Sequence, residues 1–275
     1  MANPKDGFRK EDFPILDYPG DGRGVIEPSR LYRKKKGFPE RCVLTFFKDV
    51  LDKSAREGEI SFVTELPGEG DAAAVYLMKG KTQTGSGNVR IGEEDVAIVF
   101  PGVGAPLAVC TLEEVIALGA NRFVCCGGAG VLDKEISCGT LIVPNRALRD
   151  EGTSYHYQPR GRFSEPSSVA IHAIREILSQ RGISFLEGPT WTTDAVFRET
   201  VEKIAKRKEE GCLSVEMEAA ALFAAARFRN VTFGQILYAG DDVSGPEWKH
   251  REWMKQAETR EELLRLAVEA VRRIP

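Results

Sequence analysis

The spacing of hydrophobic positions changes repeatedly along the chain and predicts short buried strands separated by helices. Apolar runs short enough for strands cover residues 96–100, 123–126, 139–143, 183–186 and 231–238. Apolar positions at helical spacing cover residues 38–56, 106–118, 168–181 and 259–274. Because strands and helices alternate, the central region has the pattern of an α/β domain.

The helix at the C-terminal end has the clearest pattern. Thr259 and Glu262 are spaced as a capping box, which satisfies backbone N–H groups at a helix start. Residues 106–118 are bounded by Pro106 near the start and Gly119 after the end. The apolar stripe of the last helix consists of Leu263, Leu266, Ala267, Ala270, Val271 and Ile274.

No internal repeat, low-complexity tract or linker divides the chain. Residues 1–24 are rich in Gly, Pro, Asp and Lys without lasting periodicity, so we expect an irregular arm that could pack on a partner subunit. Residues 25–275 are expected to form a single α/β domain, because a chain of 275 residues can bury one large core.

Composition and charge exclude several classes of protein. The chain is 42% hydrophobic and 29% charged, which is typical of a globular protein. Lys and Arg total 38 against 41 for Asp and Glu, so the net charge is −3. This balance disfavours a general polyanion binder, and no nucleic-acid partner is expected. The short basic run at 33–36 is interpreted as a solvated surface stretch.

The cysteines and the N-terminus indicate the compartment. The six cysteines form no CxxC pair, and Cys125 and Cys126 are adjacent within an apolar run. Buried free thiols in a reducing cytosol fit this pattern. The N-terminus has no apolar signal core, and no apolar run reaches the roughly 18 residues of a membrane span. We therefore expect a cytoplasmic protein without a membrane partner.

Two glycine-rich segments follow predicted strands, at residues 102–104 and 127–130. Glycine lets backbone N–H groups approach a ligand closely. Tight turns need glycine as well, so the residues alone leave both interpretations open. Neither segment completes the dinucleotide-binding or P-loop pattern, and no organic cofactor is expected.

Two pairs of acidic residues carry the candidate chemistry. Glu216 and Glu218 are two positions apart, which places them on one side of an extended chain. A helix beginning near Glu218 would turn both acids into one pocket; the alternative is two solvated acids at a helix start. Asp241 and Asp242 follow a buried strand, where α/β sheets bind ligands, or else they form an Asx turn. No metal-ligand pattern accompanies them, so no metal is expected.

These segments together resemble the nucleoside phosphorylase family, which includes purine nucleoside and uridine phosphorylases as well as hydrolytic nucleosidases. The most specific match is Val-Glu-Met-Glu-Ala-Ala-Ala at 215–221, preceded by 192–194 and 197–200 and followed by Asp241. The glycine segments match in the same order. The likeness runs from about residue 25 to 274.

The resemblance implies a three-layer α/β/α sandwich with a central mixed sheet, assembled as a homodimer or homohexamer. It implies cleavage of the N-glycosidic bond of a nucleoside, with phosphate as a possible co-substrate. In the catalytic site, Glu218 would bind the ribose 2′- and 3′-hydroxyls, and Asp241 would protonate the base. The further substrate-binding positions would be Glu216, Met217, Gly128, Ala129, Gly130, Val196 and Phe197.

The expected phosphate site departs from the family pattern. The arginine of its first turn is matched by Arg30, but Ile26 replaces the leading glycine. Cys125 stands in place of a second arginine, and Gly128 in place of a Ser or Thr. Arg30 and Gly104 remain as the expected phosphate ligands. A pocket with fewer arginines suits water better than phosphate, which introduces hydrolysis as an alternative.

Two further departures bear on the substrate. Thr200 and Glu202 occupy the places of the family's uridine-specific Gln and Arg, which favours a purine base. The N-terminal histidine that reaches a neighbour's ribose 5′ position is missing before Val25. We therefore expect a purine nucleoside phosphorylase. A hydrolytic nucleosidase is the alternative, and a non-catalytic nucleoside-binding protein is the second alternative.

Overall fold

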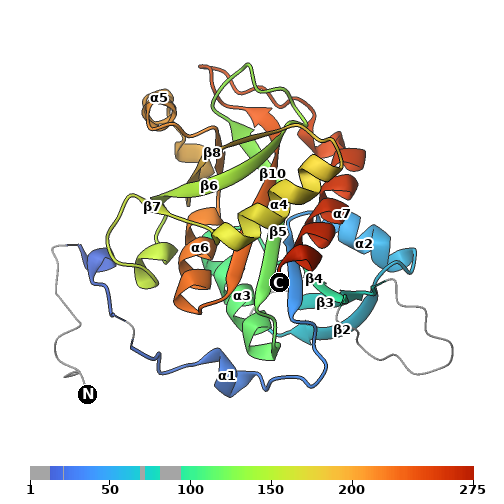
Figure 1. Cartoon of the computed structure of the whole chain (residues 1–275). Coiled ribbons are helices and arrows are strands. Elements are labelled where there is room, and N and C mark those ends of the chain that lie inside the picture. The colour runs from blue at the N-terminus through green and yellow to red at the C-terminus, as the bar shows by residue number, and fades with distance from the viewer. Residues whose placement is uncertain (1–12, 21, 69–71, 81–93) are drawn as a thin grey trace.

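The computed structural model describes residues 13–20, 22–68, 72–80 and 94–275 (Figure 1). Its strands form one ten-stranded sheet. The strands are β1 (Arg41–Thr45), β2 (Ser61–Leu66), β3 (Ala73–Met78), β4 (Val96–Val99), β5 (Arg122–Val131), β6 (Leu141–Asp150), β7 (Phe163–Ser164), β8 (Phe185–Thr193), β9 (Ser214–Glu216) and β10 (Thr232–Asp242). The helices are α1 (Pro28–Leu31), α2 (Lys48–Arg56), α3 (Ala105–Leu118), α4 (Ser168–Gln180), α5 (Val201–Glu209), α6 (Ala219–Phe228) and α7 (Ala257–Arg273).

The sheet is mixed and closes on itself along one side. The order is β10-β6-β8-β9-β5-β1-β4-β3-β2, and β10 also pairs with β5, so five strands form a ring. β4, β1, β5 and β10 are parallel neighbours, whereas β2, β3 and β4 pair antiparallel. Small and branched side chains of three ring strands pack in one buried cluster, among them Ala129, Val131, Ile142 and Leu237.

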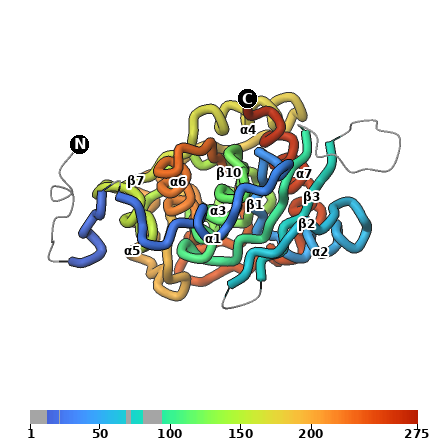
Figure 2. The backbone as a smooth tube through the Cα atoms, turned by 90° about the horizontal axis from the view of Figure 1, so that it is seen from below, coloured from blue at the N-terminus to red at the C-terminus, as the bar shows by residue number. Residues whose placement is uncertain are grey.

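Helices cover both faces of the sheet, as Figures 1 and 2 show. On one face, α2, α4 and α7 bury a cluster that includes Ile174 and Val271. On the other face, α3 and α6 pack on the aromatic rings of Phe123 and Phe233, whose centroids lie 6.0 Å apart. A central mixed sheet between helical layers confirms the expected α/β class, while the closure of the ring was not expected.

The first half of the helix predicted over 38–56 is wrong. Residues 41–45 form β1, and the helix begins only at Lys48. A short apolar run does not distinguish a fully buried strand from a buried helix. Here β4 and β5 flank the segment on both sides, so Cys42, Val43 and Leu44 have no exposed surface.

The second glycine segment is also not a loop. Residues 127–130 lie inside β5, which pairs with β10 along this stretch. A Cβ atom at Gly127 would lie 3.0 Å from a ring carbon of Phe46, and one at Gly128 would lie 3.0 Å from a ring carbon of Tyr238. The glycines therefore make room for neighbouring aromatic rings within the sheet.

The capping box predicted for the last helix is wrong, although its apolar stripe is confirmed. α7 begins at Ala257, with Gln256 as an N-cap that makes no side-chain cap bond. Thr259 and Glu262 consequently lie inside the first turns of the helix. The stripe residues are all buried, which fixes α7 on the sheet.

Two further expectations concern the N-terminal arm and membrane-spanning helices. The predicted arm at 1–24 falls partly outside the described residues; its described part contains one short 3₁₀ turn at Pro14–Leu16. Within the described part of the chain, no helix is both long and apolar enough to cross a membrane.

Candidate active site

A cleft of about 260 Å³ opens where the carboxyl ends of β5 and β10 meet the start of α6. It collects segments that are far apart in the sequence. Most of the substrate-binding positions expected from the sequence line it, namely Gly128, Ala129, Gly130, Val196, Glu216, Met217, Glu218 and Asp241.

Glu216 is fixed by three hydrogen bonds. Its Oε1 accepts a bond from the Thr192 hydroxyl at 2.6 Å. Its Oε2 accepts the backbone N–H groups of Glu218 at 2.8 Å and Ala219 at 2.6 Å. These two N–H groups are unpaired within the helix, because they stand at its first positions. Glu216 therefore caps α6 and ties it to β8.

Glu218 links the N-terminus of α6 to the N-terminus of α3. It is the N-cap residue of α6, and its Oε1 accepts the backbone N–H of Gly104 at 2.6 Å. Gly104 is in turn the N-cap residue of α3, with a φ of 100° that favours glycine. The N-terminus of a helix binds anions, and here the anion is the carboxylate of the protein itself. The structure thus corrects the expectation that Gly104 offers its N–H group to phosphate.

Burial changes the acidity of both glutamates. Their side chains are almost completely buried, with 7% and 5% of the residue surface exposed for Glu216 and Glu218. Burial raises the pKa of each, because a carboxylate loses hydration there. The neighbouring charge of Glu218 raises the pKa of Glu216 further, although the backbone hydrogen bonds oppose the shift. This end of the cleft therefore retains protons at higher pH than exposed glutamates do.

The opposite end of the cleft holds two facing acids. Asp241, at the end of β10, accepts a hydrogen bond from Trp248 Nε1 at 2.6 Å. Glu199 lines the same end, although the sequence analysis did not include it. Burial and the charge of Asp241 raise the pKa of Glu199 to about 7. Glu199 lies within the matched segment 197–200, but its role was not assigned because only the turn after β8 brings it to Asp241.

Asp242, the neighbour of Asp241 in sequence, has a separate structural role. It is buried and accepts bonds from Arg251 Nη2 at 2.8 Å and the Ser244 hydroxyl at 2.6 Å. Its Oδ1 also accepts the backbone N–H of Ser244, which is an Asx turn. The Asx-turn alternative is therefore confirmed for Asp242, whereas Asp241 lines the cleft.

The turn after β8 separates two residues expected beside the base. In the 3₁₀ turn Val196–Arg198, Val196 faces the cleft, whereas Phe197 is 96% exposed and does not line it. The turn directs successive side chains to different sides, so adjacent residues cannot both face inward. The structure thus corrects the placement of Phe197.

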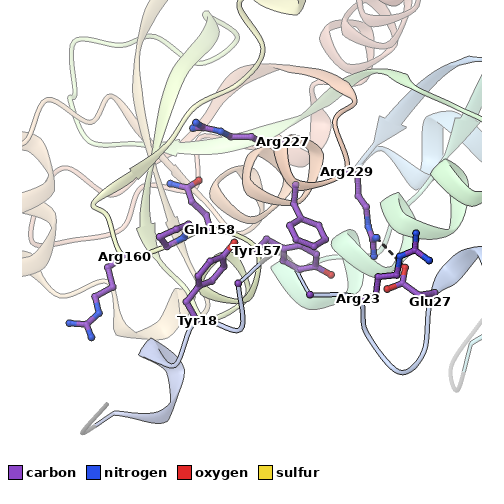
Figure 3. Close-up of a pocket in the computed structure, with 12 residues that line it drawn as sticks. Tyr18, Arg23, Glu27, Tyr157, Gln158, Arg160, Arg227 and Arg229 are labelled. Atoms are coloured by element: carbon purple, nitrogen blue, oxygen red, sulfur yellow. Dashed lines mark hydrogen bonds and ion pairs between the residues drawn. The ribbon is translucent and has the colours of Figure 1, made fainter. Parts of the chain in front are cut away.

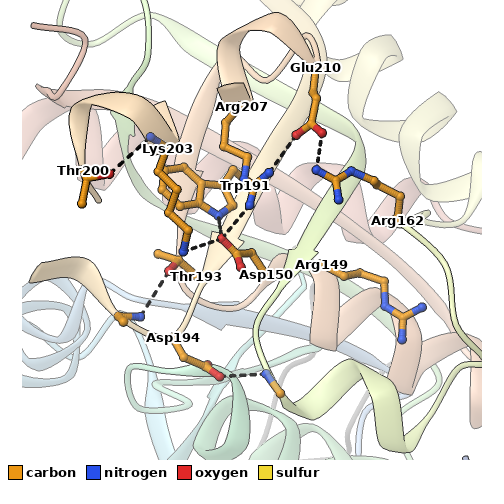
Figure 4. Close-up of polar contacts among 12 residues, drawn as sticks. Arg149, Asp150, Arg162, Trp191, Thr193, Asp194, Thr200, Lys203, Arg207 and Glu210 are labelled. Atoms are coloured by element: carbon orange, nitrogen blue, oxygen red, sulfur yellow. Dashed lines mark hydrogen bonds and ion pairs between the residues drawn. The ribbon is translucent and has the colours of Figure 1, made fainter. Parts of the chain in front are cut away.

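An ionic network fixes this turn and the helix that follows it (Figure 4). Asp150 Oδ2 accepts bonds from Trp191 Nε1 at 2.9 Å, Lys203 Nζ at 2.8 Å and Arg207 Nη2 at 3.1 Å. Burial opposes ionisation, but the bonds from Lys203 and Arg207 hold the pKa of Asp150 below its usual value. Thr200 caps α5 by accepting the Lys203 N–H. The segment that carries Glu199 is therefore held at both ends.

The cleft has little positive charge. Of the described residues that line it, only Arg260 is cationic, and its Nη2 lies 2.6 Å from the Asp49 carboxylate. Its guanidinium also lies over the Phe47 ring, 5.0 Å from the centroid. Arg30 is exposed on α1 and donates to the Val25 carbonyl, and it does not line the cleft. The structure thus corrects the expectation that Arg30 completes a phosphate site here.

A second pocket is strongly basic (Figure 3). It encloses about 810 Å³ beside the C-terminal end of α6 and the described part of the N-terminal arm. Arg229 is paired there with Glu27 and Glu113. The arginines that line the pocket are Arg23, Arg160, Arg227 and Arg229.

Metal ligands are not gathered in the described residues: no group of three or more His, Cys, Asp or Glu side chains could hold a metal ion. The cleft acids are instead bonded to hydroxyl, indole and backbone donors. The chemistry that the cleft offers is proton transfer and hydrogen bonding.

Known proteins resemble the chain in sequence and in fold. Residues 58–273 match the phosphorylase superfamily. The guanosine phosphorylase of Halorubrum lacusprofundi is 29% identical over 149 residues, which are 54% of this chain and 62% of that protein. The uridine phosphorylase of Treponema pallidum is 28% identical over 193 residues, covering 66% of this chain and 73% of that protein.

A solved structure extends the likeness to the fold. The crystal structure of AMP nucleosidase from Bacteroides thetaiotaomicron has a TM-score of 0.66 at 22% identity, covering 85% of this chain and 87% of that chain. The superfamily match covers well over half of the sequence and contains the cleft residues from Gly128 to Asp241. The chain therefore belongs to the phosphorylase superfamily.

Proposed function

We propose that the protein cleaves the N-glycosidic bond of a purine nucleoside. The observation that carries the proposal is the arrangement of acids in one cleft, with Glu218 at one end and the Asp241–Glu199 pair at the other. When the bond breaks, positive charge develops on the sugar and negative charge on the leaving base. An acid beside the base and a carboxylate beside the sugar match these charges.

The acid pair is suited to protonate the base near neutral pH. Trp248 donates a hydrogen bond to Asp241 and holds its side chain in the cleft. Glu199, with a pKa of about 7, holds its proton below about neutral pH, where an ordinary glutamate is already ionised. Glu218 keeps oxygen lone pairs for the ribose hydroxyls, because among the described residues its Oε2 accepts only the Met217 N–H, at 3.3 Å.

The residues at the two uridine-specific positions lie outside the cleft, which supports a purine base. Thr200 and Glu202, at the places of the uridine-specific residues, do not line it. Thr200 caps α5, and Glu202 is exposed. Neither position therefore offers a pyrimidine base an amide or a guanidinium group for hydrogen bonding.

We propose water as the acceptor of the sugar. Glu218 already occupies the anion position at the start of α3, and Arg260 is neutralised by Asp49. Phosphate is the second candidate, because Arg260 lines the cleft and its buried Nε has no hydrogen-bonding partner among the described residues. That nitrogen could bind a phosphate oxygen.

The test is base release from purine and pyrimidine nucleosides, with and without phosphate, followed by chromatography of the base and the sugar. Release of a purine and free pentose without phosphate would support both parts of the proposal. Release only with phosphate, giving a pentose 1-phosphate, would leave cleavage standing and replace water by phosphate. If no nucleoside is cleaved, but calorimetry detects binding, the protein is a nucleoside-binding protein.

A further inference from the structure

A glutamine at the floor of the cleft has an unusual environment. Gln235 lies on β10 and lines the cleft, yet its surface is 0% exposed. Neither its side-chain nitrogen nor its oxygen has a hydrogen-bonding partner among the described residues. Buried amides are nearly always hydrogen-bonded, so an unpaired amide that faces a cleft indicates a ligand.

The position of Gln235 places it at the sugar end of the cleft. It lies directly opposite Cys125 in the β10–β5 pair, and the Cys125 thiol interacts electrostatically with Glu216 and Glu218. Asp241 lies six residues further along β10, about 20 Å at the usual rise of a strand. One strand therefore carries the unpaired amide at one end of the cleft and the acid for the base at the other.

The chemistry of this position suits a neutral ligand. An amide offers donors and an acceptor but no charge. Of the described residues that line the cleft with it, four are acidic and only Arg260 is cationic, and the Arg260 guanidinium is paired with Asp49. An anion there would face carboxylates without a compensating charge. A water molecule can donate to the amide oxygen and accept from its nitrogen.

We propose that Gln235 binds and orients the water molecule that attacks the sugar. The proposal rests on the proposed function, with water as acceptor. The water oxygen forms a bond to the anomeric carbon, and the electron pair of the C–N bond leaves with the base. The base takes a proton from the Asp241–Glu199 pair, and the Glu218 carboxylate accepts the proton that the water loses. The products are the free base and the free pentose.

The test compares Gln235→Met with the wild-type protein, using inosine, adenosine and guanosine in water and in water–methanol mixtures. Methionine has a similar length but no amide, and Gln180→Met on the exposed end of α4 is the matched control. We expect kcat to fall about 10²-fold with little change in KM, because a misplaced nucleophile slows the chemical step. The ratio of methyl pentoside to free pentose should rise, since the acceptor is no longer selected.

The melting temperature of Gln235→Met distinguishes water binding from a purely structural role of Gln235. Because the amide has no partner within the described protein, Gln235→Met should leave the melting temperature unchanged or higher. A lower melting temperature with an unchanged methanol-to-water product ratio would overturn the proposal in favour of a packing role. So would unchanged kcat in a hydrolytic wild-type protein. A wild-type protein that requires phosphate would also overturn it, while leaving nucleoside cleavage in place.

Discussion

The two ends of helix α6 lie in opposite electrostatic surroundings. At its N-terminus, Glu216 and Glu218 accept backbone N–H groups within an acidic cleft. At its C-terminus, Arg227 and Arg229 line a basic pocket. Both agree with the helix dipole, which is positive at the N-terminus and negative at the C-terminus. A net charge of −3 conceals this separation, so the location of the arginines could not be inferred from their number.

The largest effect is expected for Glu218→Gln, which removes the negative charge of this side chain but keeps an oxygen for the Gly104 N–H. Loss of one electrostatic contact to the transition state typically lowers kcat by about 10² to 10³. Glu216→Gln is the matched control and should cost much less, because its oxygens are already bonded within the protein. Steady-state base release measures both. Equal losses would contradict the different roles given to the two glutamates.

Asp241→Asn is expected to lower purine release by about 10²-fold, at the lower end of the usual contribution of a general acid, because Glu199 remains beside the base. The fold should persist, because the indole of Trp248 can still donate to the amide oxygen. A p-nitrophenyl riboside, whose leaving group needs no proton, should be cleaved at nearly the wild-type rate. If both substrates lose activity alike, Asp241 does not act through protonation of the base.

The pH dependence of kcat should show that Glu199 is protonated when it acts on the base. Glu199 acts in its protonated form, so kcat should fall as pH rises through about 7. In Glu199→Gln this descending limb should disappear, which leaves the rise in rate as Glu218 loses its proton. The measurement is kcat between pH 6 and 8 for both proteins. A descending limb that persists in the variant belongs to another group.

Stability should also depend on pH at the sugar end. The pKa values of Glu216 and Glu218 are raised from 4.5 by folding, so the folded state binds protons more tightly than the unfolded state. Their contribution is therefore fully present below pH 4.5 and declines as pH rises through the raised values. Urea unfolding at pH 5.5 and pH 8 should show a lower free energy of unfolding at pH 8. Glu216→Gln should reduce that difference.

The smallest effect is expected in the basic pocket. Arg227→Ser removes a cation about one helix length from the cleft, and kcat/KM should stay within about twofold of the wild-type value, since surface changes distant from a site are usually small. Base release at low and physiological salt measures this. A loss above tenfold would mean that the two ends of α6 are coupled.

Much of the fold was predictable from local patterns, but close approach between distant segments was not. The alternative in which a helix begins near Glu218 and Glu216 lies in the extended entry agrees with β9 and α6, and it followed from the two-residue spacing of the glutamates. β1 was assigned to a helix, because its burial depends on strands more than 50 and 75 residues away. Glu199 was missed for a similar reason, since its acidity depends on Asp241. Phe197 is exposed because of the geometry of its turn, which a sequence motif does not specify.

The closure of β10 onto β5 has a consequence for how the backbone exchanges with solvent. The five ring strands have partners on both sides, whereas β2 pairs with β3 alone and exposes much of its surface. Amide hydrogens should therefore exchange slowest in β5 and β10, which form the floor of the cleft, and fastest along β2. Gln235 and Asp241 are therefore carried by the part of the sheet that opens least often.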